Sequence, residues 1–201
     1  MLPWVAAALE DAGAEMPEIL PNVQEAPIEA IAEAAPDLII AVYSGITDAE
    51  YDLLSQIAPT VAYPDAAWST PWRTTIEVVG ESLGKTAEAS ALLGDIDAAV
   101  AEQADAHPEL EGKSVAMVWD TGDSFYVYKA ADSRVAFTLD LGLVTAESVE
   151  AMGQVKRGTV AEVVGTEFIA AVSPPTALSL TWGLEKYVEI LSGAAMAVDA
   201  G

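Results

Sequence analysis

The sequence contains no cysteine and only one histidine, His107. Without cysteine the chain cannot form disulfides, zinc–thiolate sites or thiol nucleophiles. One histidine is too few for the histidine sets that usually bind zinc or manganese directly. Basic residues are also scarce, 8 against 32 acidic residues, which gives a net charge of −24. Because this charge repels polyanions, we expect no nucleic-acid partner. Because cysteine is absent and histidine is scarce, we also expect no metal bound directly by the protein.

Enzyme motifs and long hydrophobic runs are missing as well. The glycines match neither the dinucleotide fingerprint nor the phosphate-binding loop, and no G-x-S-x-G turn occurs. A serine–histidine–aspartate triad would need His107, which precedes Pro108 at a predicted helix end and is expected at the surface or in a cap. No signal peptide is recognisable, and no apolar stretch could cross a bilayer. We expect a soluble protein that is not an enzyme.

The segment 22–63 carries the clearest structural pattern. Pro27 suits the first turn of a helix, and Pro36 ends that helix. Residues 38–42 form a continuous apolar run, which is typical of a parallel strand covered on both faces. The pattern predicts a helix followed by a buried strand.

A second helix and strand complete this unit. Thr47 and Glu50 have the spacing of a capping box, and residues 57–63 predict a short strand. In β-α-β units, ligands bind at the carboxyl ends of the strands. Tyr43 and Tyr63 fall at these ends, so we expect them at a ligand site.

One long helix is predicted to divide the chain. Apolar residues recur at helical spacing from Gly80 to Ala106, and Pro108 follows. A helix of about 27 residues, at ~1.5 Å rise each, is a rod of roughly 40 Å. Because a packed helix resists bending, we expect only small movements between two lobes on binding.

The remaining sequence predicts a second α/β lobe. Residues 114–118 read as a strand that delivers Trp119 and Asp120 to its carboxyl end. Alternation in 125–128 puts Tyr126 and Tyr128 on one face.

Two helices follow in this lobe, with a strand-rich stretch between them at 162–172. Asp132 or Ser133 can cap the first, which carries Arg134. The closing helix is predicted at 181–196, with these packing residues: Trp182, Tyr187, Ile190 and Leu191.

An ordered succession of short motifs resembles the iron-siderophore substrate-binding proteins of ABC importers. It begins with E-x-I-A-x-x-x-P-D-L-I-x-A, Y-x-G-I-T and L-S-x-I-A-P-T-V, and continues through segments 70–73, 80–85, 107–110, 112–116, 131–135, 141–142 and 177–182. Relative to that family, the chain starts inside the amino-terminal lobe and is compressed between about residues 154 and 173.

The resemblance implies an α/β fold of two small lobes with mainly parallel sheets, joined by one backbone helix, as in class III periplasmic-binding proteins. The lobes would be 1–79 and 108–201, with the helix at 80–107. It also implies a monomer outside the cytoplasmic membrane that captures a ferric siderophore and delivers it to an ABC permease. The chelator would hold the iron, so no cofactor is expected. Acidic residues such as Glu50 or Glu147 would contact the permease, and membrane association would need a lipid anchor that this chain lacks.

A ferric siderophore suits a cleft of aromatic faces with one or two arginines. The expected ligand-binding residues lie in both lobes: Tyr43, Ser44, Tyr63, Trp68, Trp72, Arg73, Trp119, Tyr126, Tyr128 and Arg134.

Several of these residues have a structural alternative, and for Tyr126 and Tyr128 it is that both cover the hydrophobic core. Trp72 would suit core packing, Arg73 a surface ion pair, and Arg134 a local pair with Asp132 or Asp140. Trp119 would suit burial under the following loop. Two functional alternatives also stay open: a haem or corrinoid carrier of the same fold, since tyrosine can ligate haem iron, or a remnant that makes only protein contacts.

Overall fold

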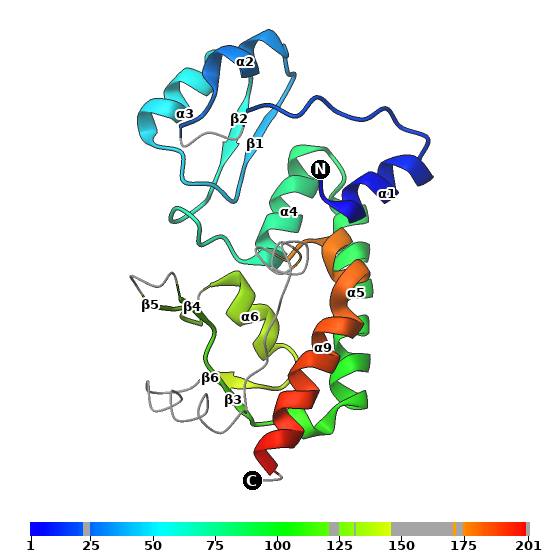
Figure 1. Cartoon of the computed structure of the whole chain (residues 1–201). Coiled ribbons are helices and arrows are strands. Elements are labelled where there is room, and N and C mark those ends of the chain that lie inside the picture. The colour runs from blue at the N-terminus through cyan, green and yellow to red at the C-terminus, as the bar shows by residue number, and fades with distance from the viewer. Residues whose placement is uncertain (22–24, 121–124, 131, 146–170, 172–174, 200–201) are drawn as a thin grey trace. The chain divides into compact units, whose positions relative to one another are not determined.

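The computed structural model describes residues 1–21, 25–120, 125–130, 132–145, 171 and 175–199 (Figure 1). The chain divides into two compact units, Met1–Ser90 and Ala91–Gly201. Helix α5 (Thr86–Ala106) contains the boundary between them. The predicted division into 1–79, 80–107 and 108–201 stays a prediction. Within the described residues, no helix combines the length and hydrophobicity needed to span a bilayer.

The first unit contains a parallel pair of strands. Strand β1 (Ile39–Ala41) pairs with β2 (Thr60–Ala62), with Ile39 opposite Thr60. Helix α2 (Ile28–Glu33) precedes β1, and α3 (Asp48–Leu54) connects the strands (Figure 1). The β-α-β order predicted from the sequence is therefore present, and both strands end at the same edge of the sheet.

Helix α3 begins with the capping box that the sequence predicts. The Thr47 hydroxyl accepts a hydrogen bond from the Glu50 amide at 3.3 Å, and Glu50 Oε2 accepts one from the Thr47 amide at 2.8 Å. Glu50 Oε1 also accepts the Ala26 amide at 2.9 Å. These backbone donors, Ala26 first, hold the pKa of Glu50 below its ordinary value. Glu50 thus ties the segment before α2 to the start of α3.

Strand β1 is less covered than its apolar run predicts. Ile40 is 42% exposed, and Ile39 and Ala41 are only partly buried. The prediction that both faces of this strand are buried is wrong. A continuous apolar run shows that a strand can be covered on both faces, but whether neighbouring elements cover it depends on tertiary packing.

The helix predicted from Gly80 to Ala106 covers the last residues of α4 (Trp72–Ser82) and all of α5. Helix α4 ends before Gly84, whose φ of +67° is a left-handed conformation, and α5 starts at Thr86. The predicted start at Gly80 is therefore wrong, because helical periodicity continues through a glycine that ends one helix. Gly80 lies inside α4, where a β-carbon would come within 2.4 Å of the Ala89 β-carbon on α5. Helix α1 (Pro3–Asp11) precedes all of these elements and buries Trp4.

The second unit has two short strand pairs in its described residues. Strand β3 (Ser114–Val115) runs parallel to β6 (Val144–Thr145). Strand β4 (Val118–Asp120) runs antiparallel to β5 (Phe125–Val127). The prediction of one strand at 114–118 is therefore wrong in extent, because residues 114–115 pair with β6 and residues 118–120 pair with β5. The predicted strands at 162–172 lie outside the described residues except for residue 171.

Helices α6 (Ser133–Leu139) and α9 (Ala177–Asp199) form the core of this unit. The rings of Phe137 and Tyr187 are buried with centroids 6.0 Å apart, and the hydroxyls of Thr138 and Tyr187 lie 2.7 Å apart. Leu191 is also buried, as predicted, whereas Trp182 is 38% exposed, so its prediction as a core residue is wrong. Trp182 lies outside the row of buried residues on α9. The sequence pattern alone did not show which side of the helix is buried.

A hydrogen-bonded carboxylate links the single-turn helix η1 (Pro108–Leu110) to α9. Glu109 Oε1 lies 2.9 Å from His107 Nδ1 and accepts a hydrogen bond from the Ser192 hydroxyl. The Ser192 bond, followed by the His107 bond, lowers the pKa of Glu109 from 4.5 to about 2. His107 thus directly precedes η1, and its side chain makes a structural contact with Glu109.

Replacing Glu109 with glutamine is expected to lower the stability of the fold near neutral pH. Because the pKa of Glu109 is about 2 in the folded state, against an ordinary 4.5, the unfolded chain binds the proton more readily. The stabilisation is therefore complete above pH 4.5 and is lost as the pH falls towards 2. Urea unfolding of both proteins across this window should show their difference disappear at low pH.

The matched control is Glu189→Gln, which removes one carboxylate from an exposed pair with Lys186. This change should alter stability little at any pH, because exposed ion pairs contribute little. A stability difference between wild type and Glu109→Gln that stays constant across the window would contradict the prediction.

Candidate functional site

Aromatic and hydroxyl side chains gather where β1 and β2 end. Tyr43 and Ser44 follow β1, and Tyr63 follows β2. The Tyr63 hydroxyl donates to the Ile46 carbonyl at 3.0 Å, and the Ser44 hydroxyl donates to the Ala41 carbonyl at 2.8 Å. The Tyr63 side chain, which follows β2, is therefore bonded to the backbone of the loop after β1. In β-α-β units, ligands bind at these strand ends.

Trp68 completes this cluster from the loop after β2. Its amide donates to the Ser44 carbonyl at 3.0 Å, and its ring meets that of Tyr43 edge-on, with centroids 5.9 Å apart. The side chain is 60% exposed. Its φ of +59° is a left-handed conformation that costs energy for a residue with a β-carbon. A large aromatic side chain that is exposed and held in a strained backbone is typical of a binding site.

Gly45 makes the position of the Trp68 ring possible. A β-carbon on Gly45 would lie 2.2 Å from Trp68 Nε1 and 2.7 Å from its Cε2. The indole therefore lies directly against the glycine backbone, and no larger residue fits there without moving the ring. Sequence reasoning missed Gly45 as a site residue. The available signal was a glycine in the loop directly after a strand that ends in tyrosine.

An open hollow of about 210 Å³ adjoins this loop. Its lining comes from the start of α3, the end of β2 and the residues beside them: Ile46, Thr47, Asp48, Tyr51, Ala62 and Tyr63. Tyr51 is partly exposed and was also missed from the sequence, although its place one turn into α3 follows from the capping box. We call Tyr43, Ser44, Gly45, Tyr63 and Trp68, together with this hollow, the strand-end site.

Trp72 and Arg73 lie at the start of α4 and differ in exposure. Trp72 is 1% exposed, which matches the packing alternative, so it offers no surface and is not part of the strand-end site. The Arg73 guanidinium lies over the Trp72 ring at 4.1 Å from its centroid. The Thr70 hydroxyl donates to the Val42 carbonyl at 2.6 Å and fixes the preceding loop to the end of β1.

In the second unit, Trp119 and Tyr126 face each other across strands β4 and β5. They are 46% and 55% exposed, so both aromatic side chains lie at the surface. The predicted placement of Trp119 after a strand is wrong, because it lies in the middle of β4. Its burial alternative is excluded by its exposure.

Tyr128 and Arg134 form a cluster with Asp132. Asp132 caps α6 and binds Arg134 with both oxygens, at 2.7 Å to Nε and 2.6 Å to Nη2. The guanidinium lies 3.8 Å from the centroid of the Tyr128 ring. The side chains of Arg134 and Asp132 are only 16% and 14% exposed. The local pairing of Arg134 with Asp132, one of the alternatives from the sequence, is therefore confirmed.

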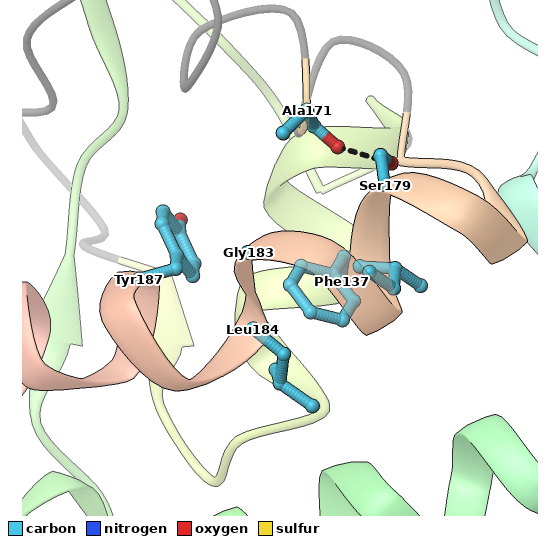
Figure 2. Close-up of a pocket in the computed structure, with 7 residues that line it drawn as sticks. Phe137, Ala171, Ser179, Gly183, Leu184 and Tyr187 are labelled. Atoms are coloured by element: carbon cyan, nitrogen blue, oxygen red, sulfur yellow. Dashed lines mark hydrogen bonds between the residues drawn. The ribbon is translucent and has the colours of Figure 1, made fainter. Parts of the chain in front are cut away.

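An enclosed space between α6 and α9 is too small for a solute. Its volume is about 10 Å³, and it is bordered by Phe137 of α6 and by Gly183 and Tyr187 of α9 (Figure 2). The Ser179 hydroxyl donates to the Ala171 carbonyl at 2.6 Å beside it. One water molecule needs about this much room, so the space belongs to packing. No group of three acidic, histidine or cysteine side chains in the described residues could hold a metal ion.

The fold and the strand-end site define a class: α/β binding proteins built from two units with short parallel sheets and a helix that continues from one unit into the other. A family model described as periplasmic binding protein matches residues 6–193, and the chain belongs to this family. A search of curated proteins found no match.

Solved structures give more specific similarities. The iron uptake ABC transporter substrate-binding protein PiaA from Streptococcus pneumoniae is 27% identical, with a TM-score of 0.89 over 98% of this chain and 84% of that one. PiaA in complex with ferrichrome is 26% identical, with a TM-score of 0.88 over 98% and 82% of the two chains. SirA from Staphylococcus aureus complexed with staphyloferrin B is 30% identical, with a TM-score of 0.53 over 78% and 51%.

Proposed function

We propose that this protein is an extracytoplasmic solute-binding protein that captures a ferric siderophore and delivers it to an ABC importer. The observation that carries the proposal is Trp68, an exposed indole held in a left-handed backbone at the carboxyl ends of two parallel strands. Membership of the periplasmic binding protein family and the similarity to PiaA support it.

The proposed mechanism is binding without chemistry. The indole of Trp68 and the ring of Tyr43 offer apolar surface to the organic shell of the chelate, and the hydroxyls beside them offer hydrogen bonds. Iron remains in its chelator, so the protein needs no cofactor and breaks no bond. Trp119 and Tyr126, exposed register partners in β4 and β5, stay predicted ligand-binding residues of the second unit.

The proposal includes a monomer that docks on permease subunits through acidic surface residues. Of the two residues suggested by the resemblance, Glu147 lies outside the described residues. Glu50 holds three hydrogen bonds within its own unit, from Ala26 and Thr47, so its contribution to docking would compete with them.

A tryptophan-fluorescence titration tests the proposal. Ferric hydroxamate, catecholate and carboxylate siderophores, haem, a corrinoid and the iron-free chelators would each be added to the folded protein. We expect saturable, iron-dependent quenching by a ferric siderophore at submicromolar concentration. Saturation by haem or a corrinoid alone would assign the site to that ligand, and no response from folded protein would favour a chain that makes only protein contacts.

A further inference from the structure

The hollow of the strand-end site is too small to enclose a whole chelate. Its volume is about 210 Å³, whereas pockets that enclose a drug-sized ligand have about 300 to 1,000 Å³. It can therefore hold one group of a larger ligand, or one small molecule. All the residues that line it belong to the first unit, so its chemistry follows from that unit alone.

Two hydroxyl groups in the lining are already used as donors within the protein. The Tyr63 hydroxyl donates to the Ile46 carbonyl at 3.0 Å. The Thr47 hydroxyl donates to Glu50 Oε2 at 2.8 Å. Because an anion is bound through donated hydrogen bonds, these two hydroxyls offer it nothing.

The charges beside the hollow are negative. Asp48 lines it and is exposed. Glu50 accepts hydrogen bonds from the amide and the hydroxyl of Thr47, so a second carboxylate is fixed beside a lining residue. The first unit has only two basic side chains, Arg73 and Lys85, and neither lines the hollow. The local potential therefore favours a positively charged group.

Two tyrosine rings give the hollow its apolar surface. Tyr51, in α3, is 40% exposed, and Tyr63 is held by its hydrogen bond to Ile46. The face of an aromatic ring attracts a cation, and aromatic sites of this kind recognise organic ammonium groups. A metal ion would need several oxygen ligands, whereas the lining contains a single carboxylate. An organic cation therefore fits these residues better than an anion or a metal ion.

We propose that the hollow is a subsite for an alkylammonium group, with Asp48 as its counter-charge and the rings of Tyr51 and Tyr63 as its apolar surface. The group belongs either to a charged arm of the cargo or to a separate small amine, and the chemistry of recognition is the same in both cases. This inference goes beyond the proposed function, in which the hollow has no role of its own.

Titration with n-pentylammonium tests the proposal on the whole folded chain. Backbone amide shifts of ¹⁵N-labelled protein would report binding, with 1-pentanol as a neutral probe of similar length. We expect n-pentylammonium to saturate at a concentration on the order of millimolar, with shifts at the residues of the hollow. The alcohol should bind at least about fivefold more weakly, because it has no charge for the carboxylate and the rings to attract. Equal affinity for the two probes would overturn the inference.

Two substitutions and a matched control locate the subsite. Asp48→Asn and Tyr51→Leu should each weaken n-pentylammonium binding about threefold, since exposed ion pairs and cation–π contacts are both modest. Asp37→Asn removes an exposed carboxylate from the same unit, but it precedes β1, at the opposite end of that strand from the hollow. At an ionic strength of about 0.15 M it should change the affinity by about 1.5-fold or less. Equal losses in Asp37→Asn and Asp48→Asn, or no loss in Asp48→Asn, would overturn the inference.

The ferric siderophore that quenches tryptophan fluorescence separates the two sources of the ammonium group. If Asp48→Asn weakens binding of that chelate as well as of n-pentylammonium, the group is an arm of the cargo. If only n-pentylammonium binding is weakened, the group belongs to a separate small amine. Binding of n-pentylammonium without binding of any siderophore would overturn the proposed function and leave the subsite standing. The reverse result would overturn the subsite alone.

Discussion

Replacing Trp68 with alanine is expected to weaken siderophore binding about 30-fold, which corresponds to about 2 kcal/mol. The indole is the largest exposed aromatic surface of the strand-end site, and it lies against Gly45 with its edge towards Tyr43. Alanine removes that contact surface while the loop keeps its backbone hydrogen bond from residue 68 to Ser44.

The fold should tolerate this change. Alanine also carries a β-carbon, so the left-handed backbone at this position costs about as much as before. The lost interaction within the protein is the edge-on contact with Tyr43, which is worth about 1 kcal/mol. Since the exposed indole buries little surface in the free protein, urea unfolding should show a loss of stability no larger than this.

Calorimetry is the suitable measurement, because the substitution removes a fluorescence probe. Trp182→Ala on α9 is the matched control, since it removes another partly exposed indole from outside the strand-end site, and it should leave affinity unchanged. Gly45→Ala should weaken binding in the same direction as Trp68→Ala, because the added methyl group displaces the ring. If Trp68→Ala and Gly45→Ala both bound the siderophore as tightly as wild type, the assignment of the strand-end site as the binding site would be contradicted.

Gly80→Ala is expected to destabilise the first unit by about 2 kcal/mol. The added methyl group would lie 2.4 Å from the Ala89 β-carbon and 3.3 Å from the Lys85 carbonyl oxygen. Ala89 has no rotatable side chain, so α4 and α5 must move apart to relieve the overlap. The higher helix propensity of alanine offsets about 1 kcal/mol of the gross cost.

Gly94→Ala provides the control for this prediction. Gly94 lies in α5 with open space where its β-carbon would be, so alanine should raise stability by up to about 1 kcal/mol. Urea unfolding of the two variants should therefore give changes of opposite sign. If Gly80→Ala proved as stable as Gly94→Ala, the close approach of α4 to α5 would be contradicted.

Local rules predicted the first half of the fold well. The Thr47–Glu50 capping box and the strand pair on either side of α3 follow from spacing and apolar runs, and both are present. The break at 83–85 was missed because the apolar repeat passes through it. The alternating stretch at 125–128 was predicted, but its antiparallel pairing with β4 was not, because strand partners are chosen by tertiary structure.

The residues of the candidate sites were likewise predicted only where local sequence patterns define them. Tyr43 and Tyr63 were predicted at strand ends, and the Asp132–Arg134 pair was foreseen because the two residues are close in sequence. The contact of Trp68 with Gly45 joins residues on different loops, so no local pattern announces it. Sequence also could not separate Trp68 from Trp72, since exposure is set by packing rather than by residue type.

The fixed position of Trp68 has a consequence for the speed of capture. Its amide bond to Ser44, its ring contact with Tyr43 and the bare backbone of Gly45 hold one orientation before any ligand arrives. Little rotational freedom of the indole is then left to lose on association. A binding protein whose site is preorganised can associate with its ligand at the ordinary rate of about 10⁵ to 10⁷ M⁻¹s⁻¹. Differences in affinity between chelates would then arise mainly from their dissociation rates.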